Sequence, residues 1–152
     1  MKRVHLCTGI LQRGARVLLV AEQYPNQPKV LWNPPGGRQH DGELLHETLR
    51  REFAEETGLQ IACGALQYVS ESYDRSTGTH FTNFTFAVSA DGEPVLPSDD
   101  AHVIALEWVD VRDVSSRIAV AVVREPLLAH LRGETQRYFA YADAGISIEF
   151  AD

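Results

Sequence analysis

Residues 44–57 have the pattern of an amphipathic helix that needs a larger apolar surface on which to pack. Leu45, Leu49 and Phe53 recur at every fourth position, which places them on one face of an α-helix. Gly58 follows at the point where a glycine in the left-handed conformation commonly ends a helix. The sequence therefore predicts a helix over this segment, held on its apolar side by the rest of the chain.

The end of this predicted helix carries a group of carboxylates. At about 100° per residue, Glu52, Glu55 and Glu56 fall within an arc of about 100°, so their side chains converge. Like charges at this spacing destabilise a helix, and negative charge is also unfavourable near the C-terminal end of the helix dipole. A solvated helix face is the ordinary explanation for a charge run. A divalent cation is the alternative, because carboxylate oxygens suit Mg²⁺ or Mn²⁺.

Much of the charge of the chain lies in the same region. Lys and Arg number 14 against 21 Asp and Glu, which gives a net charge of −7. Residues 37–59 hold six acidic and three basic side chains and so contribute −3 of this total. Because an acidic protein repels the phosphate backbone, we expect no general nucleic-acid binding.

The length and the cysteine content indicate the broad class of protein. The 152 residues fit one domain, residues 1–152. Cys7 and Cys63 lack the spacing of a zinc site or a disulfide framework, as in proteins of a reducing compartment. The sequence has no apolar run of about 18 residues and no features of a signal peptide, so we expect a cytoplasmic protein that does not enter a membrane.

Apolar alternation and turn residues predict the remaining elements. We expect a β-hairpin of residues 4–11 and 16–22, strands at 30–32, 61–72, 80–89 and 103–109, a helix at 126–131 with Pro126 in its first turn, and a closing β-hairpin of 138–142 and 146–150. Residues 118–123 fit either type of element. The mixture of helices and strands places the chain in the α/β class.

Residues 37–59 read GRQHDGELLHETLRREFAEETGL. This stretch resembles the signature of the Nudix hydrolases, Gly-x5-Glu-x7-Arg-Glu-U-x-Glu-Glu-x-Gly-U with U a bulky apolar residue, and every fixed position matches. Residues outside the stretch extend the resemblance over most of the chain: Trp32, Pro35, Gly36, Trp108 and Val109. The resemblance implies a Nudix-type α/β/α sandwich with a mixed β-sheet, to which the predicted C-terminal hairpin would be added.

The resemblance also implies roles for residues of this stretch. Glu52, Glu55 and Glu56 would bind Mg²⁺, or Mn²⁺, together with the carbonyl oxygen of Gly37. Arg51 would orient a glutamate through an ion pair. A water molecule activated by the cation would attack a phosphorus atom of a pyrophosphate while a glutamate accepts the proton. We choose Glu52 as that base and count Arg51 and Glu56 with it as catalytic.

Other positions stay open at this point. Glu43 would either fasten the loop to the helix or reach the cation through water. Many relatives carry a further acidic residue in the loop before the late tryptophan strand. The candidates here are Asp99, Asp100 and His102, and the sequence does not choose among them.

The implied substrate is a small molecule in which a nucleoside diphosphate is linked to another group. No proline occurs between Gly37 and Pro94, whereas ADP-ribose hydrolases have one at a fixed distance after the signature. The length and the C-terminal elements look most like nucleoside triphosphate pyrophosphohydrolases, including those that act on oxidised purines. The alternatives are hydrolysis of nucleotide sugars, ADP-ribose or dinucleoside polyphosphates, and a non-catalytic module that binds a nucleotide.

Several side chains outside the carboxylate cluster are candidates for substrate binding. They are Arg38, Asn33, Tyr73, Arg75 and His102. Each has an ordinary structural alternative, which is a turn side chain for Asn33 and simple loop exposure for Tyr73 and Arg75. Trp32 is expected in the core more than at a ligand. The chain would act as a monomer or a homodimer, since the sequence does not show which strand edges are exposed.

Overall fold

The computed structural model describes residues 2–99 and 102–150. Within these residues the elements are β1 (Lys2–Arg13), β2 (Arg16–Glu22), β3 (Leu31–Asn33), β4 (Gly36–Arg38), α1 (Leu45–Thr57), β5 (Ala62–Asp74), β6 (Thr79–Ser89), β7 (Val103–Asp110), α2 (Val114–Arg117), α3 (Ala121–Leu131) and β8 (Tyr138–Tyr141), with a 3₁₀ turn at Val111–Asp113. None of the helices described is long and apolar enough to cross a membrane.

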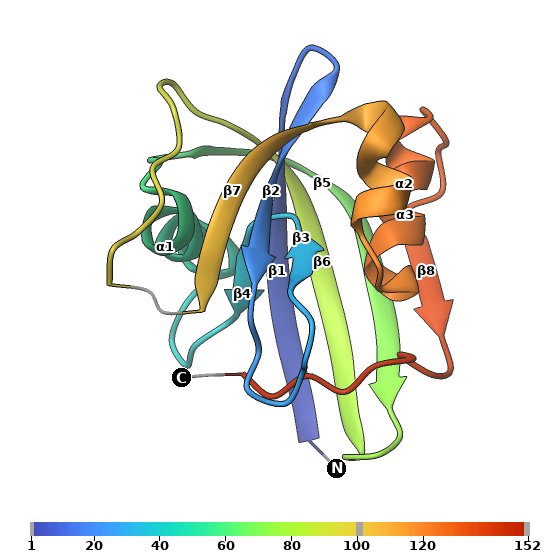
Figure 1. The fold of residues 1–152 in the computed structure, drawn as a ribbon. Helices are drawn as coiled ribbons and strands as arrows, with labels where there is room; N and C mark the ends of the chain where they lie inside the picture. The colour runs from blue at the N-terminus through green and yellow to red at the C-terminus, as the bar shows by residue number, and fades with distance from the viewer. Residues whose placement is uncertain (1, 100–101, 151–152) are drawn as a thin grey trace.

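The strands form a mixed sheet in the order β3-β2-β1-β6-β5-β8, with β4 paired to β1 and β7 paired to β2. β1 runs parallel to β6, and β5 is antiparallel to β6 but parallel to β8. The end of β1 turns away from β6 to pair with β2, so this strand joins the two parts of the sheet. Figure 1 shows α1 on one side of the strands and α2 with α3 on the other. The α/β class with a mixed sheet is thereby confirmed.

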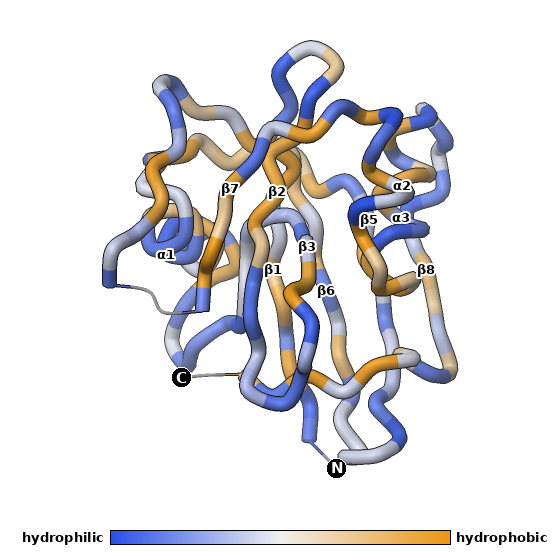
Figure 2. Tube along the Cα trace, in the orientation of Figure 1, coloured by the Kyte–Doolittle hydropathy of each residue, from blue (hydrophilic) through white to orange (hydrophobic). Residues whose placement is uncertain are grey.

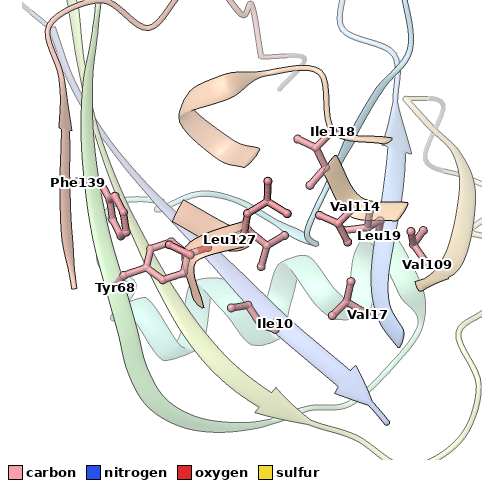
Figure 3. Close-up of a cluster of buried hydrophobic side chains, with 11 residues drawn as sticks. Ile10, Val17, Leu19, Tyr68, Val109, Val114, Ile118, Leu127 and Phe139 are labelled. Atoms are coloured by element: carbon pink, nitrogen blue, oxygen red, sulfur yellow. The ribbon is translucent and has the colours of Figure 1, made fainter. Parts of the chain in front are cut away.

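The helices are held by two apolar clusters. Figure 3 shows the first, in which Leu127 of α3 and Val114 of α2 pack with side chains of β1, β2 and β5. In the second, Leu49 and Phe53 of α1 are fully buried against the sheet. A Cβ atom on Gly9 of β1 would lie 2.6 Å from the Phe53 ring, so only glycine allows α1 to approach this closely. The predicted apolar face of the helix is the face that is buried.

Most of the predicted elements are present. The N-terminal hairpin, the short strand near Trp32 and the strands β5, β6 and β7 lie within a few residues of their expected bounds. α1 ends at Gly58 in the left-handed conformation, with φ 72°, as the pattern indicated. The ambiguous residues 118–123 connect α2 to the first turn of α3, which puts Pro126 inside α3 and not in its first turn. Burial of Leu127 and Leu128 against the sheet outweighs the weak helix preference of the valines before them.

The predicted closing hairpin is wrong. β8 forms, but its partner is β5, beside which it runs parallel. Residues 146–150 form no strand and bond instead to the loop after β2, where Asn26 Nδ2 donates to the Ser147 carbonyl at 2.8 Å. Figure 1 shows this part of the chain running from β8 across the lower end of the strands. The alternation that suggested a strand fits a cavity wall, because Ile146, Ile148 and Phe150 line a cavity.

Candidate active site

The end of α1 meets β4, and two glutamates of α1 lie against the glycines of that strand. The Glu56 side chain is only 1% exposed, and its Oε1 accepts the Gly36 N–H at 2.9 Å. A Cβ atom on Gly37 would lie 2.6 Å from both Cδ and Oε1 of Glu52. Glycine at this position therefore leaves the space that the Glu52 carboxylate occupies. The sequence suggested a partly exposed helix face here, but burial by β4 makes Glu56 an interior carboxylate.

Arg51 holds the preceding loop and the glutamates in one arrangement. Its Nε donates to Glu43 Oε2 at 2.7 Å, and its Nη1 donates to Glu52 Oε1 at 2.8 Å. Its Nη2 also donates to the Arg38 carbonyl at 2.9 Å. These bonds raise the pKa of Arg51, and they lower the pKa of Glu43 to about 2, chiefly through the hydrogen bond from Arg51. Of the two roles expected for Glu43, the structure places it in the first, fastening the loop to the helix.

Glu52 differs from an ordinary surface carboxylate because its side chain is largely buried, which changes its pKa. Its side chain is 13% exposed. Desolvation raises the pKa of Glu52 to about 7, against the opposing effect of Arg51 and with smaller contributions from the charges of Glu55 and Glu22. Glu55 lies farther out, with its side chain 53% exposed and its Oε2 3.4 Å from Arg51 Nη1. Glu52 thus changes protonation state near neutral pH in the cation-free protein.

The structure adds Glu22, at the end of β2, to the carboxylates found from the sequence. Glu22 is 4% exposed, and its Oε2 accepts the Tyr24 O–H at 3.1 Å. One ligand atom each of Glu22, Glu56 and His102 lie within 4.8 Å of one another, a geometry that could hold a metal ion. Asp99 is exposed and is not part of this group, and Asp100 lies outside the described residues. Glu22 could have been found from the sequence, because it is the acidic residue at the end of the apolar run of β2.

A cavity of about 130 Å³ opens beside these carboxylates. Glu22 and Gly37 belong to its lining, so the cavity is continuous with the carboxylate cluster. Apolar side chains of β1, of α3 and the residue before it, and of the last described residues form most of its walls, among them Leu6, Val120, Val123, Ile146, Ile148 and Phe150. The arrangement provides an acidic end that can hold a cation and an adjoining apolar space.

Of the predicted substrate-binding residues, one lines this cavity, two lie beside residues that line it, and two make their contacts elsewhere. Asn33 lines the cavity, His102 Nε2 lies 3.5 Å from Glu22 Oε2, and the Arg38 guanidinium lies over the Phe150 ring at 5.2 Å. The Tyr73 ring stacks on the His80 ring, on the face of the sheet opposite the cavity. Arg75 donates to the Ala142 carbonyl at 3.0 Å.

The position of Tyr73 follows from the length of β5. The sequence suggested a loop from residue 73, whereas β5 continues to Asp74. Alternate residues of a strand point to opposite faces. Ser70 and Ser72 line the cavity, so Tyr73 points to the other face and stacks on His80 with ring centroids 4.7 Å apart. Trp32 packs against the first apolar cluster beneath Arg117, as expected of a core residue.

The family profile described as NUDIX domain matches residues 2–131. The chain belongs to the Nudix hydrolase family. An uncharacterized Nudix hydrolase of Bacillus subtilis, YvcI, is 33% identical over 76% of this chain and 70% of its own length. An ADP-ribose pyrophosphatase of Methanocaldococcus jannaschii is 33% identical over 61% of this chain, which spans only 54% of that relative. A Nudix hydrolase structure from Nitrosomonas europaea has a TM-score of 0.75 at 19% identity, covers 98% of each chain and supports the fold.

The raised pKa of Glu52 gives this Nudix hydrolase an expected pH dependence of stability. Without a cation, the folded state holds the proton up to about pH 7 and the unfolded state only to 4.5. The free energy of unfolding should therefore fall as pH rises between these values, by up to about 3 kcal/mol. Urea unfolding in a chelator at about pH 5 and about pH 8 measures the loss, and Glu52→Gln should lack this part of it. Equal losses in both proteins would contradict the assignment.

Proposed function

We propose that this Nudix hydrolase uses Mg²⁺, with Mn²⁺ as a substitute, to hydrolyse a nucleoside triphosphate to a nucleoside monophosphate and pyrophosphate. The observation that carries the proposal is the cavity of about 130 Å³ with apolar walls that opens beside the buried carboxylates. A nucleobase has apolar faces and polar edges and suits such a space, while the phosphates would lie at the acidic end. An oxidised purine nucleotide is included among the candidate substrates.

The residues present suit a divalent cation. Nudix hydrolases generally depend on one, and carboxylate oxygens are the donors that Mg²⁺ and Mn²⁺ prefer. Glu52 and Glu56 are buried here, and Gly37 leaves room for the Glu52 carboxylate. Glu52, Glu55, Glu56 and the Gly37 carbonyl are the proposed ligands, with Glu22 and His102 beside Glu56. When bound, the cation would neutralise phosphate charge and lower the pKa of water.

The chain itself would position and deprotonate the attacking water. Glu52 is the proposed base, since its largely buried carboxylate lies against Gly37 within the proposed ligand cluster. Arg51 orients the Glu52 carboxylate through its 2.8 Å hydrogen bond. Glu56 is held in place by the Gly36 N–H. The pKa of Tyr24 is raised well above its usual value by burial and by the charge of Glu22, so the phenol stays a hydrogen-bond donor to that carboxylate.

The substrate contacts are assigned by position. Asn33 lines the cavity, where its amide could read the edge of a base. His102 stands beside Glu22, and Arg38 follows Gly37 directly, where a guanidinium could meet a phosphate. Tyr73 and Arg75 stay outside the proposed site, because the Tyr73 ring stacks on His80 and Arg75 donates to the Ala142 carbonyl.

Product analysis across a substrate panel tests the proposal. The panel holds normal and oxidised nucleoside triphosphates, ADP-ribose, nucleotide sugars and dinucleoside polyphosphates, each with Mg²⁺. We expect pyrophosphate and a nucleoside monophosphate from a triphosphate. Preferred cleavage of a nucleotide sugar, ADP-ribose or a dinucleotide would support hydrolysis of a pyrophosphate bond but contradict the assignment of a nucleoside triphosphate as substrate. Binding of a nucleotide without hydrolysis of any would reject catalysis in favour of a binding module.

A further inference from the structure

The outer wall of the cavity comes from a part of the chain beyond the residues that the family profile matches. The profile ends at residue 131, and the trailing segment, defined here as residues 142–150, follows β8. Figure 1 shows it running across the lower end of the strands, and Figure 2 shows apolar residues recurring along it. Ile146, Ile148 and Phe150 line the cavity. The trailing segment therefore supplies a wall from outside the residues that the family profile matches.

Hydrogen bonds hold the trailing segment on both of its sides. The Ala144 N–H donates to the Tyr73 carbonyl at 2.6 Å, and Ser147 Oγ donates to Asp74 Oδ2 at 2.7 Å. On the side of the loop after β2, the Glu149 N–H donates to Asn26 Oδ1 at 2.8 Å. Ser147 and Glu149 alternate with Ile146, Ile148 and Phe150, which line the cavity together with Ala144. Since ordered backbone contacts fix the segment, its apolar side chains form a defined surface.

Phe150 connects this wall to the catalytic end of the cavity. Its ring lies edge-on to the Tyr24 ring, with centroids 6.1 Å apart, and beneath the Arg38 guanidinium at 5.2 Å. Tyr24 in turn donates to Glu22, and Arg38 follows Gly37. A substrate whose phosphates lay at the carboxylates would thus place its next group against the trailing segment.

The lining also limits the chemistry of that group. Among the described residues that line the cavity, Glu22 is the only charged side chain. A second phosphate there would meet no cationic side chain in the lining, which is unfavourable because a buried charge needs a partner. Thr8, Asn33, Ser70, Ser72 and Asn83 also belong to the lining and can bond the sugar hydroxyls and the base edge of a nucleoside. A nucleoside, whose uncharged base has apolar faces, is the group that fits.

We propose that Ile146, Ile148 and Phe150 of the trailing segment are specificity-determining residues, which select a substrate whose phosphates are linked to a nucleoside with an uncharged base. The inference rests on the proposed function, since it takes the carboxylates to hold the phosphates. It adds the source of the selection, which lies outside the residues that the family profile matches.

The test compares two probes, one that carries a nucleoside and one that does not. One is a nucleoside triphosphate with a methylene group between its α and β phosphorus atoms, and the other is methylenediphosphonate, which has no base. Equilibrium binding of each is measured in Mg²⁺ for the parent, Ile148→Ser and Ile148→Val. The matched control is Ile104→Ser, because Ile104 is an exposed isoleucine of β7. Unfolding curves of all four proteins show whether they fold.

We expect Ile148→Ser to weaken binding of the nucleotide probe by about tenfold or more and to leave the diphosphonate unchanged. Ile148→Val should recover most of the loss, and Ile104→Ser should bind as the parent does. If Ile148→Ser weakened binding of both probes equally, or of neither, the proposed role of the trailing segment would be overturned. The proposed function would still stand in that case, provided that the parent protein bound the diphosphonate. If the parent bound neither probe, the proposed function would fail and the inference with it.

Discussion

Replacing Glu56 by glutamine is expected to lower turnover by about 10²- to 10⁴-fold while the protein keeps its fold. Glutamine has the same size, and its Oε1 can still accept the Gly36 N–H that Glu56 accepts at 2.9 Å. The change therefore removes only a buried negative charge, which is the property that a cation ligand needs. Steady-state rates with Mg²⁺ and a urea unfolding curve measure the two parts of this expectation.

Glu47→Gln is the matched control for this experiment. Glu47 is an exposed glutamate in the first turn of the same helix. Its replacement should leave both turnover and the unfolding midpoint unchanged. If Glu56→Gln kept full activity, Glu56 would not be a ligand. If it failed to fold, the buried charge would be needed by the structure and the effect on turnover could not be assigned to catalysis.

Replacing Arg51 by methionine is expected to lower the free energy of unfolding by about 3 kcal/mol. Methionine fills similar space but cannot donate hydrogen bonds, so the Glu43 and Glu52 carboxylates would lose their cationic partner. The Arg38 carbonyl would lose a donor as well. Urea unfolding at neutral pH measures the loss as a shift of the midpoint at constant slope.

Arg50→Met provides the comparison, because Arg50 is the neighbouring arginine and is exposed. That change should cost no more than about 0.5 kcal/mol. A double variant with Glu43→Gln should lose less than the sum of its parts, since one unpaired charge is removed with its partner. A loss for Arg51→Met no larger than that for Arg50→Met would show that the arginine contributes little to the fold.

The parts of the fold that the sequence predicted best are those with a strong local pattern. α1 was found because Leu45, Leu49 and Phe53 repeat at helical spacing and Gly58 ends the helix. The trailing segment shows the limit of such patterns. Apolar and polar residues do alternate along it, but this pattern shows only that one side of the segment is apolar. A segment that lines a cavity has the same pattern as a strand. Partners far apart in the sequence decide between the two.

The same limit applies to the candidate site. The carboxylates of α1 were predicted together because one helix carries them all. Glu22 was missed because its approach to Glu56 and His102 depends on how β2 and the residues before β7 meet α1 in space. Tyr73 was expected at the substrate because β5 seemed to end earlier. Because β5 continues to Asp74, Tyr73 belongs to the strand, and its side chain points to the face opposite that of Ser70 and Ser72.

The bonding of Arg51 also bears on how the Nudix signature tolerates change over evolution. Glu43 belongs to the loop before α1, and its two oxygens receive Arg51 Nε and Nη2 at 2.7 and 3.0 Å. Between them, Leu45 and Leu49 pack in the second apolar cluster and Thr48 donates to Glu43 Oε1 at 3.1 Å, while the exposed positions contribute mainly the length of chain. One inserted residue in α1 would turn Arg51 by about 100° around the helix axis and carry it away from Glu43. The exposed positions between Glu43 and Arg51 can therefore vary, whereas an insertion or a deletion would separate the two side chains.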